Sequence, residues 1–201
     1  QGSEGWSRRY EYDALGRCSS LCDANGNLTR YVRDGLGRLA RTIDALGGVT
    51  TFGYDARGAL VNVTRSDGKG SSRQTRYERD LLGRVTKAID PLGNETAYDY
   101  DALGYPVRVV DADGYATSYG YTPTGALQTI GYADGRTVDF GYDTLGRLID
   151  VEDWRGSTSI ERDAVGRMVS VEDCSGSVVR YERDVAGELT GLVYPDGGRA
   201  G

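Results

Sequence analysis

The sequence has no histidine, and its 201 residues include only one methionine, two phenylalanines and two tryptophans. Without histidine, the Ser-His and Cys-His nucleophile systems are excluded within this segment. No apolar run approaches the roughly 20 residues that a membrane-spanning helix needs, and no signal peptide is visible at the start. The net charge of −6 argues against a nucleic-acid partner or an anionic membrane surface.

Cysteine is scarce as well, with three residues at Cys18, Cys22 and Cys174. Cys18 and Cys22 are four residues apart on one predicted strand, roughly 13 Å at the rise of a strand, which is too far for a disulfide. Cys174 falls in a distant predicted turn. We therefore expect free thiols in a reducing compartment and no metal site, because the chain lacks histidine and a second close cysteine pair.

Glycine, in contrast, is abundant, with 30 residues, and it recurs at fixed positions. Nine copies of a unit of about 21 residues fill the chain. In each copy a first glycine ends an Asp-x-x-Gly turn, with Thr122 in place of Asp in the sixth copy, and a second glycine follows ten residues later. The first glycines are Gly16, Gly37, Gly58, Gly83, Gly104, Gly125, Gly146, Gly166 and Gly187. The sequence is thus one array of nine repeats over residues 1–201, and we interpret it as a fragment of a longer array because neither end looks like a capping unit.

Each unit begins with residues that alternate with a period of two, as in a half-buried strand. Six residues before the first glycine, eight copies have an aromatic residue, and Ile160 is the exception. These residues are Tyr10, Tyr31, Phe52, Tyr77, Tyr98, Tyr119, Phe140 and Tyr181. Four residues before the glycine, on the same strand face, the position is always Tyr or Arg: Tyr12, Arg33, Tyr54, Arg79, Tyr100, Tyr121, Tyr142, Arg162 and Arg183. The pattern predicts an aromatic stripe on one face and a wet, acidic opposite face.

Asp followed three residues later by Gly predicts a chain reversal, because the Asp side chain bonds the backbone and Gly tolerates a positive φ. The return strand has apolar residues whose spacing departs from two, which predicts a bulge or a change of face. We therefore expect an all-β fold of about 18 strands, in tandem β-hairpins that form a curved, spiralling antiparallel sheet, because flat open sheets rarely exceed about ten strands. The insertion around residues 69–73 and the deletion before Gly166 are expected to be edge or loop adjustments.

The candidate chemistry in the sequence is weak. Paired carboxylates suggest glycoside hydrolysis, but turns and a wet strand face explain nearly all of them. Asp111-Ala112-Asp113-Gly114 resembles a calcium loop without its later oxygen ligands. The aromatic stripe suits stacking on sugars, although packing between hairpins is favoured because the stripe runs through the whole array. We expect surface contacts at the tyrosines outside the stripe, which are Tyr105, Tyr115, Tyr132 and Tyr194. Trp154 falls at a turn tip, where its indole could touch a partner, but an idle surface ring is favoured.

The repeated pattern Tyr-x-Tyr-Asp-x-x-Gly-Arg-Leu strongly resembles the YD repeat of the RHS (rearrangement hotspot) family. It stands as Tyr10-Glu11-Tyr12-Asp13-Ala14-Leu15-Gly16-Arg17 and as Phe140-Gly141-Tyr142-Asp143-Thr144-Leu145-Gly146-Arg147-Leu148. The resemblance implies a β-hairpin sheet that spirals into a hollow shell around a C-terminal polypeptide, commonly a toxin; related shells occur in toxin complexes and teneurins. Neither a plug domain nor the family's Asp-Pro self-cleavage motif is visible, and Asp90-Pro91 reads as an ordinary turn.

These observations lead to one hypothesis and two rivals. The first is a non-catalytic shell segment that folds in the bacterial cytoplasm, encloses a C-terminal toxin and is exported, for example by type VI secretion, in interbacterial competition. Its partners would be flanking repeats, the enclosed polypeptide and a secretion apparatus. The rivals are an extracellular carbohydrate-binding or adhesion module at the cell surface, and an enzyme. We assign no catalytic, cofactor-binding or metal-ligating residue and expect no cofactor.

Overall fold

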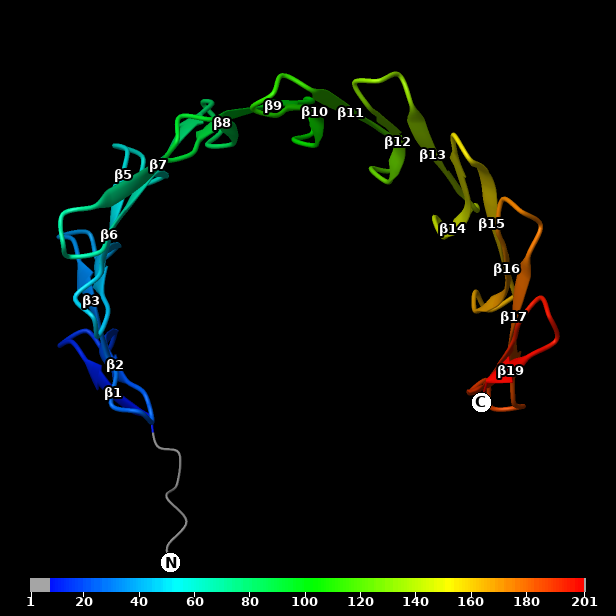
Figure 1. Cartoon of the computed structure of the whole chain (residues 1–201), viewed down its shortest axis with the longest axis horizontal. Coiled ribbons are helices and arrows are strands. Elements are labelled where there is room, and N and C mark those ends of the chain that lie inside the picture. Colours follow the sequence, from blue (N-terminus) through cyan, green and yellow to red (C-terminus); the bar gives the residue numbers. More distant parts are fainter. Residues whose placement is uncertain (1–7, 201) are drawn as a thin grey trace, which may run out of the picture. The chain divides into compact units, whose positions relative to one another are not determined.

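The computed structural model describes residues 8–200, and within them it contains strands and turns but no helix. The chain divides into two compact units, of which the first ends at Ala97 and the second begins at Tyr98. In each unit, the strands follow one another as a curved, open antiparallel sheet (Figure 1). The all-β prediction is therefore confirmed.

The first unit is a series of hairpins in which each strand pairs with the next one along the chain. Its strands are β1 (Arg9–Tyr12), β2 (Cys18–Cys22), β3 (Leu28–Arg33), β4 (Leu39–Ile43), β5 (Val49–Tyr54), β6 (Leu60–Ser66), β7 (Ser72–Arg79), β8 (Val85–Ile89) and β9 (Glu95–Tyr100), the last of which contains the boundary between the units.

The second unit repeats the same arrangement. Its strands are β10 (Pro106–Val110), β11 (Ala116–Tyr121), β12 (Leu127–Gly131), β13 (Thr137–Tyr142), β14 (Leu148–Asp153), β15 (Gly156–Arg162), β16 (Met168–Glu172), β17 (Val178–Arg183), β18 (Leu189–Val193) and β19 (Arg199–Ala200). The structure thus has one strand more than the roughly 18 expected, because two residues after the ninth repeat already pair with β18.

Two kinds of hairpin alternate, and they differ in register. In the hairpins closed by the first glycine, the register shifts by one residue just before the Tyr or Arg position, for example between Glu78 and Arg79. The hairpins closed by the second glycine pair without a shift, as in Lys87↔Ala97 and Ile89↔Glu95. The bulge predicted from the uneven apolar spacing is confirmed, and it follows the turn in each first hairpin whose register is described.

The two length irregularities both lie in second hairpins. The insertion lengthens the β6–β7 hairpin, so that Ser72 and Arg73 are strand residues paired with Ser66 and Arg65 rather than loop residues. The deletion tightens the β14–β15 turn, where Asp153 pairs directly with Gly156. Both changes leave the first turns and the pairing of the flanking strands intact, so they are adjustments at one edge of the sheet.

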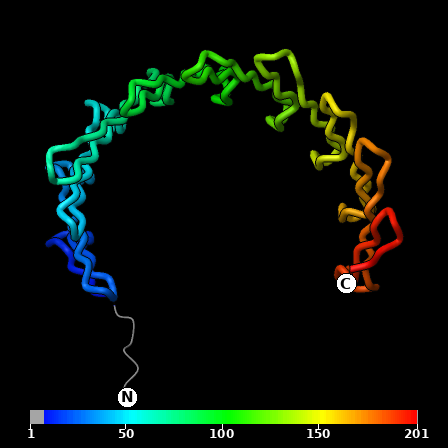
Figure 2. The backbone as a smooth tube through the Cα atoms, in the orientation of Figure 1, coloured from blue at the N-terminus to red at the C-terminus, as the bar shows by residue number. Residues whose placement is uncertain are grey.

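The sheet has a single layer and almost no core. In Figure 2 the chain folds back on itself hairpin after hairpin within each unit. Among the described residues, Ile89 is the only buried large hydrophobic residue, with 8 % of its surface exposed. Most strand residues are half-buried. Their side chains contact those of the neighbouring strands, but among the described residues no second layer packs on either face of the sheet.

Candidate functional site

The carboxylate of the Asp-x-x-Gly turn holds the turn together. In the β13–β14 turn, Asp143 Oδ1 accepts the backbone N–H groups of Leu145 and Arg147, each at 2.9 Å. Asp143 Oδ2 accepts the Arg147 guanidinium at 2.6 Å. The same Asp–Arg pair recurs in the turns at Asp13, Asp34, Asp80 and Asp163. These carboxylates are thus engaged by the backbone and the arginine of their own turn.

The partners of the turn aspartates favour the charged carboxylate. The backbone N–H of Arg147, with its guanidinium and the N–H of Leu145, holds the pKa of Asp143 below its ordinary value of 3.8, although burial opposes this. The pKa of Asp34 is lowered chiefly by the side-chain hydrogen bond from Arg38. A carboxyl whose pKa is depressed by folding contributes stability above its unfolded pKa and loses it as the pH falls through the folded value.

We therefore expect the turn at Asp143 to loosen as the pH falls below 3.8, the ordinary value from which the Asp143 pKa is lowered. Hydrogen exchange of the Leu145 and Arg147 amides in the native protein, corrected for intrinsic rates, should show their protection decreasing in this range.

The β11–β12 turn supplies an internal control for this titration. Thr122 replaces Asp there, and its Oγ1 accepts the Ala126 N–H at 3.0 Å without a titratable group. The Ala126 amide should keep its protection over the same pH range. Equal loss of protection at Ala126 and Arg147 would contradict the assignment.

In five repeats, a second contact joins the repeat to the one before it. The Tyr four residues before the first glycine donates its hydroxyl to the backbone carbonyl of the residue two after the preceding first glycine. Tyr54 donates to Leu39 at 2.9 Å, and Tyr121 donates to Pro106 at 2.8 Å. Tyr142 donates to Leu127 at 2.6 Å. We call this set of bonds the ladder.

Arginine takes the same place in other repeats. The Nε of Arg79 donates to the Leu60 carbonyl at 2.9 Å, and the Nε of Arg162 donates to the Leu148 carbonyl at 3.1 Å. A second nitrogen of each guanidinium bonds the glycine carbonyl of its own turn. Arg33 and Arg183 keep only the bond to their own turn, and their buried Nε atoms have no partner. Tyr and Arg four residues before the first glycine can therefore make the same contact, a hydrogen bond to a backbone carbonyl of the preceding repeat.

The ladder accounts for part of the predicted aromatic stripe. The Tyr121 ring also stacks on Tyr105 with centroids 4.9 Å apart, and burial is the main cause that raises the Tyr121 pKa. In the first unit, the Arg38 guanidinium lies 4.5 Å from the centre of the Tyr54 ring. Packing between hairpins is therefore confirmed for these tyrosines. Tyr105, predicted to be a surface contact, instead lies in the stack with Tyr121.

The remaining predicted candidates lie in ordinary turns or strands. Asp90 accepts the N–H groups of Leu92 and Asn94, as the other turn aspartates do. Asp111 does the same for Asp113 and Tyr115. Cys18, Cys22 and Cys174 are free thiols. Within residues 8–200, no group of three or more His, Cys, Asp or Glu side chains is placed to hold a metal ion, and no helix that could cross a lipid bilayer occurs there.

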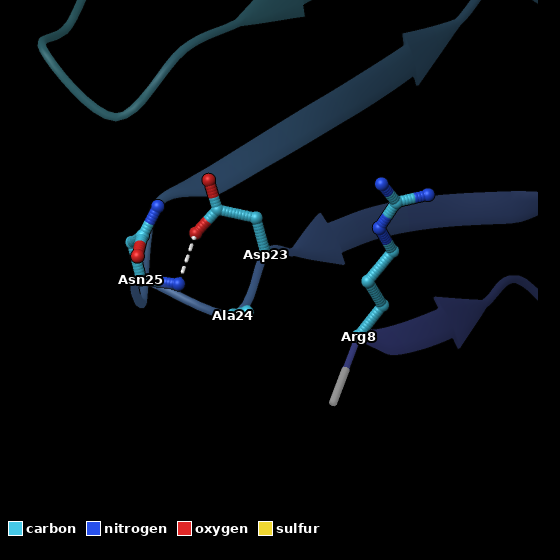
Figure 3. Close-up of a pocket in the computed structure, with 4 residues that line it drawn as sticks. All are labelled: Arg8, Asp23, Ala24 and Asn25. Atoms are coloured by element: carbon cyan, nitrogen blue, oxygen red, sulfur yellow. Dashed lines mark hydrogen bonds between the residues drawn. The ribbon is translucent and has the colours of Figure 1, made fainter. Parts of the chain in front are cut away.

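Shallow grooves lie between neighbouring turns. One is lined by Arg8 and the turn residues Asp23, Ala24 and Asn25, where the Asn25 N–H donates to Asp23 at 2.8 Å (Figure 3). Arg8 lies directly before strand β1, apart from this turn. Another is lined by residues of two neighbouring first turns, among them Arg57 and Leu81, and Arg57 reaches across to the Leu81 carbonyl at 2.9 Å. Both grooves are lined mainly by residues of the repeated turns.

Exposed leucines mark the tips of the first turns, a feature that our sequence analysis did not single out. Leu36 is 80 % exposed in the first unit, and Leu145 is 74 % exposed in the second. The full set in this position or next to it is Leu15, Leu36, Leu81, Leu82, Leu103, Leu145, Val165 and Val185. Because first turns share one edge of an antiparallel series of hairpins, each unit presents a row of apolar tips along that edge. The Leu that recurs directly before the first glycine of many repeats was the sequence feature that could have predicted this apolar row.

Comparison with known families agrees with this geometry. The sequence model of the RHS Repeat family matches residues 12–49, 33–69, 79–116, 100–137 and 162–199, which together are well over half of the chain. A search among curated proteins found no match.

Two solved structures share the fold. A Tc holotoxin pore of Photorhabdus luminescens, with a substitution in TccC3, aligns with a TM-score of 0.59 at 16% identity over 93% of this chain. TcdB2-TccC3 without its hypervariable C-terminal region aligns with a TM-score of 0.58 at 18% identity, also over 93% of this chain. The chain spans only 12% of the length of these relatives, and at this identity the likeness concerns the fold.

Proposed function

Because this chain belongs to the RHS repeat family, we propose that it forms part of the wall of a shell that encloses a polypeptide of the same protein. The proposed role is containment: a continuous hydrogen-bonded sheet excludes proteases, and its inner face holds a poorly folded cargo. The chain itself would be non-catalytic in this role.

The observation that carries the proposal is the single-layer sheet without a core. Ile89 alone among large hydrophobic residues 8–200 is buried, although globular domains gain most of their stability from such burial. Side chains on both faces are half-buried, and the leucine rows at the turn tips are exposed. Such a sheet gains further stability when other repeats cover its edges and cargo covers one face.

The proposal also covers the identity of the enclosed segment and the route by which the protein leaves the cell. One fold relative is described as a Tc holotoxin pore, and another, TcdB2-TccC3, is described without a hypervariable C-terminal region. We therefore propose that the enclosed segment is a C-terminal toxin. We further propose that the protein folds in a bacterial cytoplasm and is then exported, through a machine such as the type VI secretion system, against competing cells.

Limited proteolysis of the native, full-length protein tests enclosure. Intact-mass analysis should show a segment outside the repeats that resists digestion until the shell is denatured. The same segment released from the shell by denaturation and dilution serves as the control, and it should be cut at once. Rapid cleavage of that segment while the repeats stay intact would overturn the proposal and leave an open scaffold.

A further inference from the structure

Three aromatic side chains depart from the repeat on one edge of the second unit. Tyr115, Tyr132 and Trp154 lie at the consecutive second turns β10–β11, β12–β13 and β14–β15. Consecutive second turns are two strand spacings apart, about 10 Å. Tyr115 is 63% exposed, and Trp154 is 49% exposed. The second turns of the first unit have no aromatic residue in their Asp-x-x-Gly segments, so the repeat itself does not require these rings.

The first two rings line a groove. Its volume is about 410 Å³, within the range of roughly 300–1,000 Å³ common for small-molecule sites. Tyr115 and Tyr132 contribute rings, and Ala116 and Ala133 contribute methyl groups. The remaining lining residues are polar: Asp111, Thr117 and Asp134. The groove therefore combines apolar ring surface with hydrogen-bonding groups.

One carboxylate oxygen in this groove is available to a ligand. Asp111 Oδ1 accepts the N–H groups of Asp113 and Tyr115. In the corresponding turns at Asp23 and Asp90, Oδ2 accepts the side-chain amide of an asparagine. Tyr115 takes the place of that asparagine and brings no amide, so Asp111 Oδ2 has no hydrogen-bond donor among residues 8–200.

The negative charge of Asp134 in this groove is partly compensated by Arg136. Arg136 Nε lies 3.4 Å from Asp134 Oδ2, and the guanidinium lies 5.0 Å from the centre of the Trp154 ring. The groove thus offers carboxylate acceptors at Asp111 and Asp134 and hydroxyl donors at Thr117 and the two tyrosines, and Arg136 lies beside it, paired with Asp134. A cationic ligand would meet Arg136, whereas a neutral ligand whose hydroxyls both donate and accept satisfies both kinds of group.

We propose that this groove binds a neutral saccharide. The tyrosine rings lie against the apolar C–H face of a sugar ring, and Asp111 Oδ2 accepts a sugar hydroxyl. The spacing of the three turns along this edge suits an extended oligosaccharide better than a single sugar. The site is independent of enclosure, because it needs only the second unit and makes no claim about cargo.

The test uses the native protein and its Trp154→Phe variant, and the difference between their emission spectra isolates the signal of Trp154. The Tyr132 ring meets Trp154 edge-on, with centroids 6.1 Å apart, so occupation of the groove should change the Trp154 emission. Cellobiose, chitobiose and maltose are titrated as neutral probes, and n-butylammonium is the cationic control. We expect saturable binding of at least one disaccharide, with a dissociation constant in roughly the millimolar range.

Matched variants locate the site. Tyr115→Ala and Tyr132→Ala should each weaken disaccharide binding by tenfold or more, while Tyr115→Phe and Tyr132→Phe keep most of it. Tyr194→Ala is the control, because Tyr194 occupies the same turn position as Tyr132 but is followed by Gly198 instead of Arg136. Absence of any saccharide response, unchanged binding in Tyr115→Ala, or preferential binding of n-butylammonium would each overturn the proposal. Circular dichroism of the variants excludes loss of fold as the cause.

Discussion

Replacing Gly68 with alanine is expected to destabilise the β6–β7 hairpin by about 2–5 kcal/mol, which combines the cost of a left-handed backbone with that of overpacking. Gly68 has φ +72, and a Cβ there would lie 2.7 Å from the carbonyl oxygen of Gly47 in the neighbouring second turn. A backbone atom cannot rotate away as the end of a side chain does. The two turns would have to separate.

Substitutions at two other glycines of the first unit distinguish the cost of the left-handed backbone from the cost of overpacking. Gly47 has φ +82 with open space around it, so Gly47→Ala should cost only the backbone term of about 1–2 kcal/mol. Gly35 has neither a positive φ nor a close neighbour, so Gly35→Ala should stay within about 0.5 kcal/mol of the native protein. Hydrogen exchange of the hairpin amides measures each value locally. Equal effects at Gly68 and Gly47 would contradict the close approach of the two turns.

Loss of a ladder tyrosine is the second large effect. Tyr121→Ala removes the hydroxyl bond to the Pro106 carbonyl and the stack on Tyr105, and it leaves a gap between two hairpins. We expect a loss of about 2–4 kcal/mol in the local free energy of unfolding of strands β10–β12. Hydrogen exchange with mass spectrometry, on peptides from these strands in the native protein, gives this value.

Two substitutions test whether the ladder is the cause. Tyr121→Phe keeps the ring and removes only the hydroxyl, so it should cost about 0.5–1.5 kcal/mol. Tyr115→Ala removes a tyrosine that is 63% exposed and should change local stability by about 0.5 kcal/mol or less. A Tyr121→Phe variant as unstable as Tyr121→Ala would show that the hydroxyl bond dominates. A harmless Tyr121→Ala would contradict the ladder.

The turns and strands were predictable because each is coded locally. Asp143 and Gly146 specify a reversal through their own backbone bonds, and the same signal occurs in eight of the nine first turns. The uneven spacing after the first glycine also predicted the bulge, since an extra residue such as the one between Val85 and Lys87 shifts the register. These features depend on residues fewer than about ten positions apart, where sequence patterns are most informative.

The ladder and the groove were not predicted, because each depends on where a side chain reaches across the sheet. Tyr121 bonds a carbonyl 15 residues away, and that separation becomes 19 for Arg79 after the insertion and 14 for Arg162 after the deletion. The constant relation is to the preceding turn, which only the register reveals. Trp154 was predicted at a turn tip, but its contacts with Tyr132 and Arg136 come from the neighbouring hairpin.

The most direct test of the central claim is an electron cryo-microscopy reconstruction of the full-length native protein. The proposal predicts that residues 8–200 form part of a closed wall and that polypeptide density fills the space on one face of the sheet. The exposed leucine tips, such as Leu36 and Leu145, should lie against further repeats. An open sheet with both faces in bulk solvent, and no density beside either face, would contradict containment.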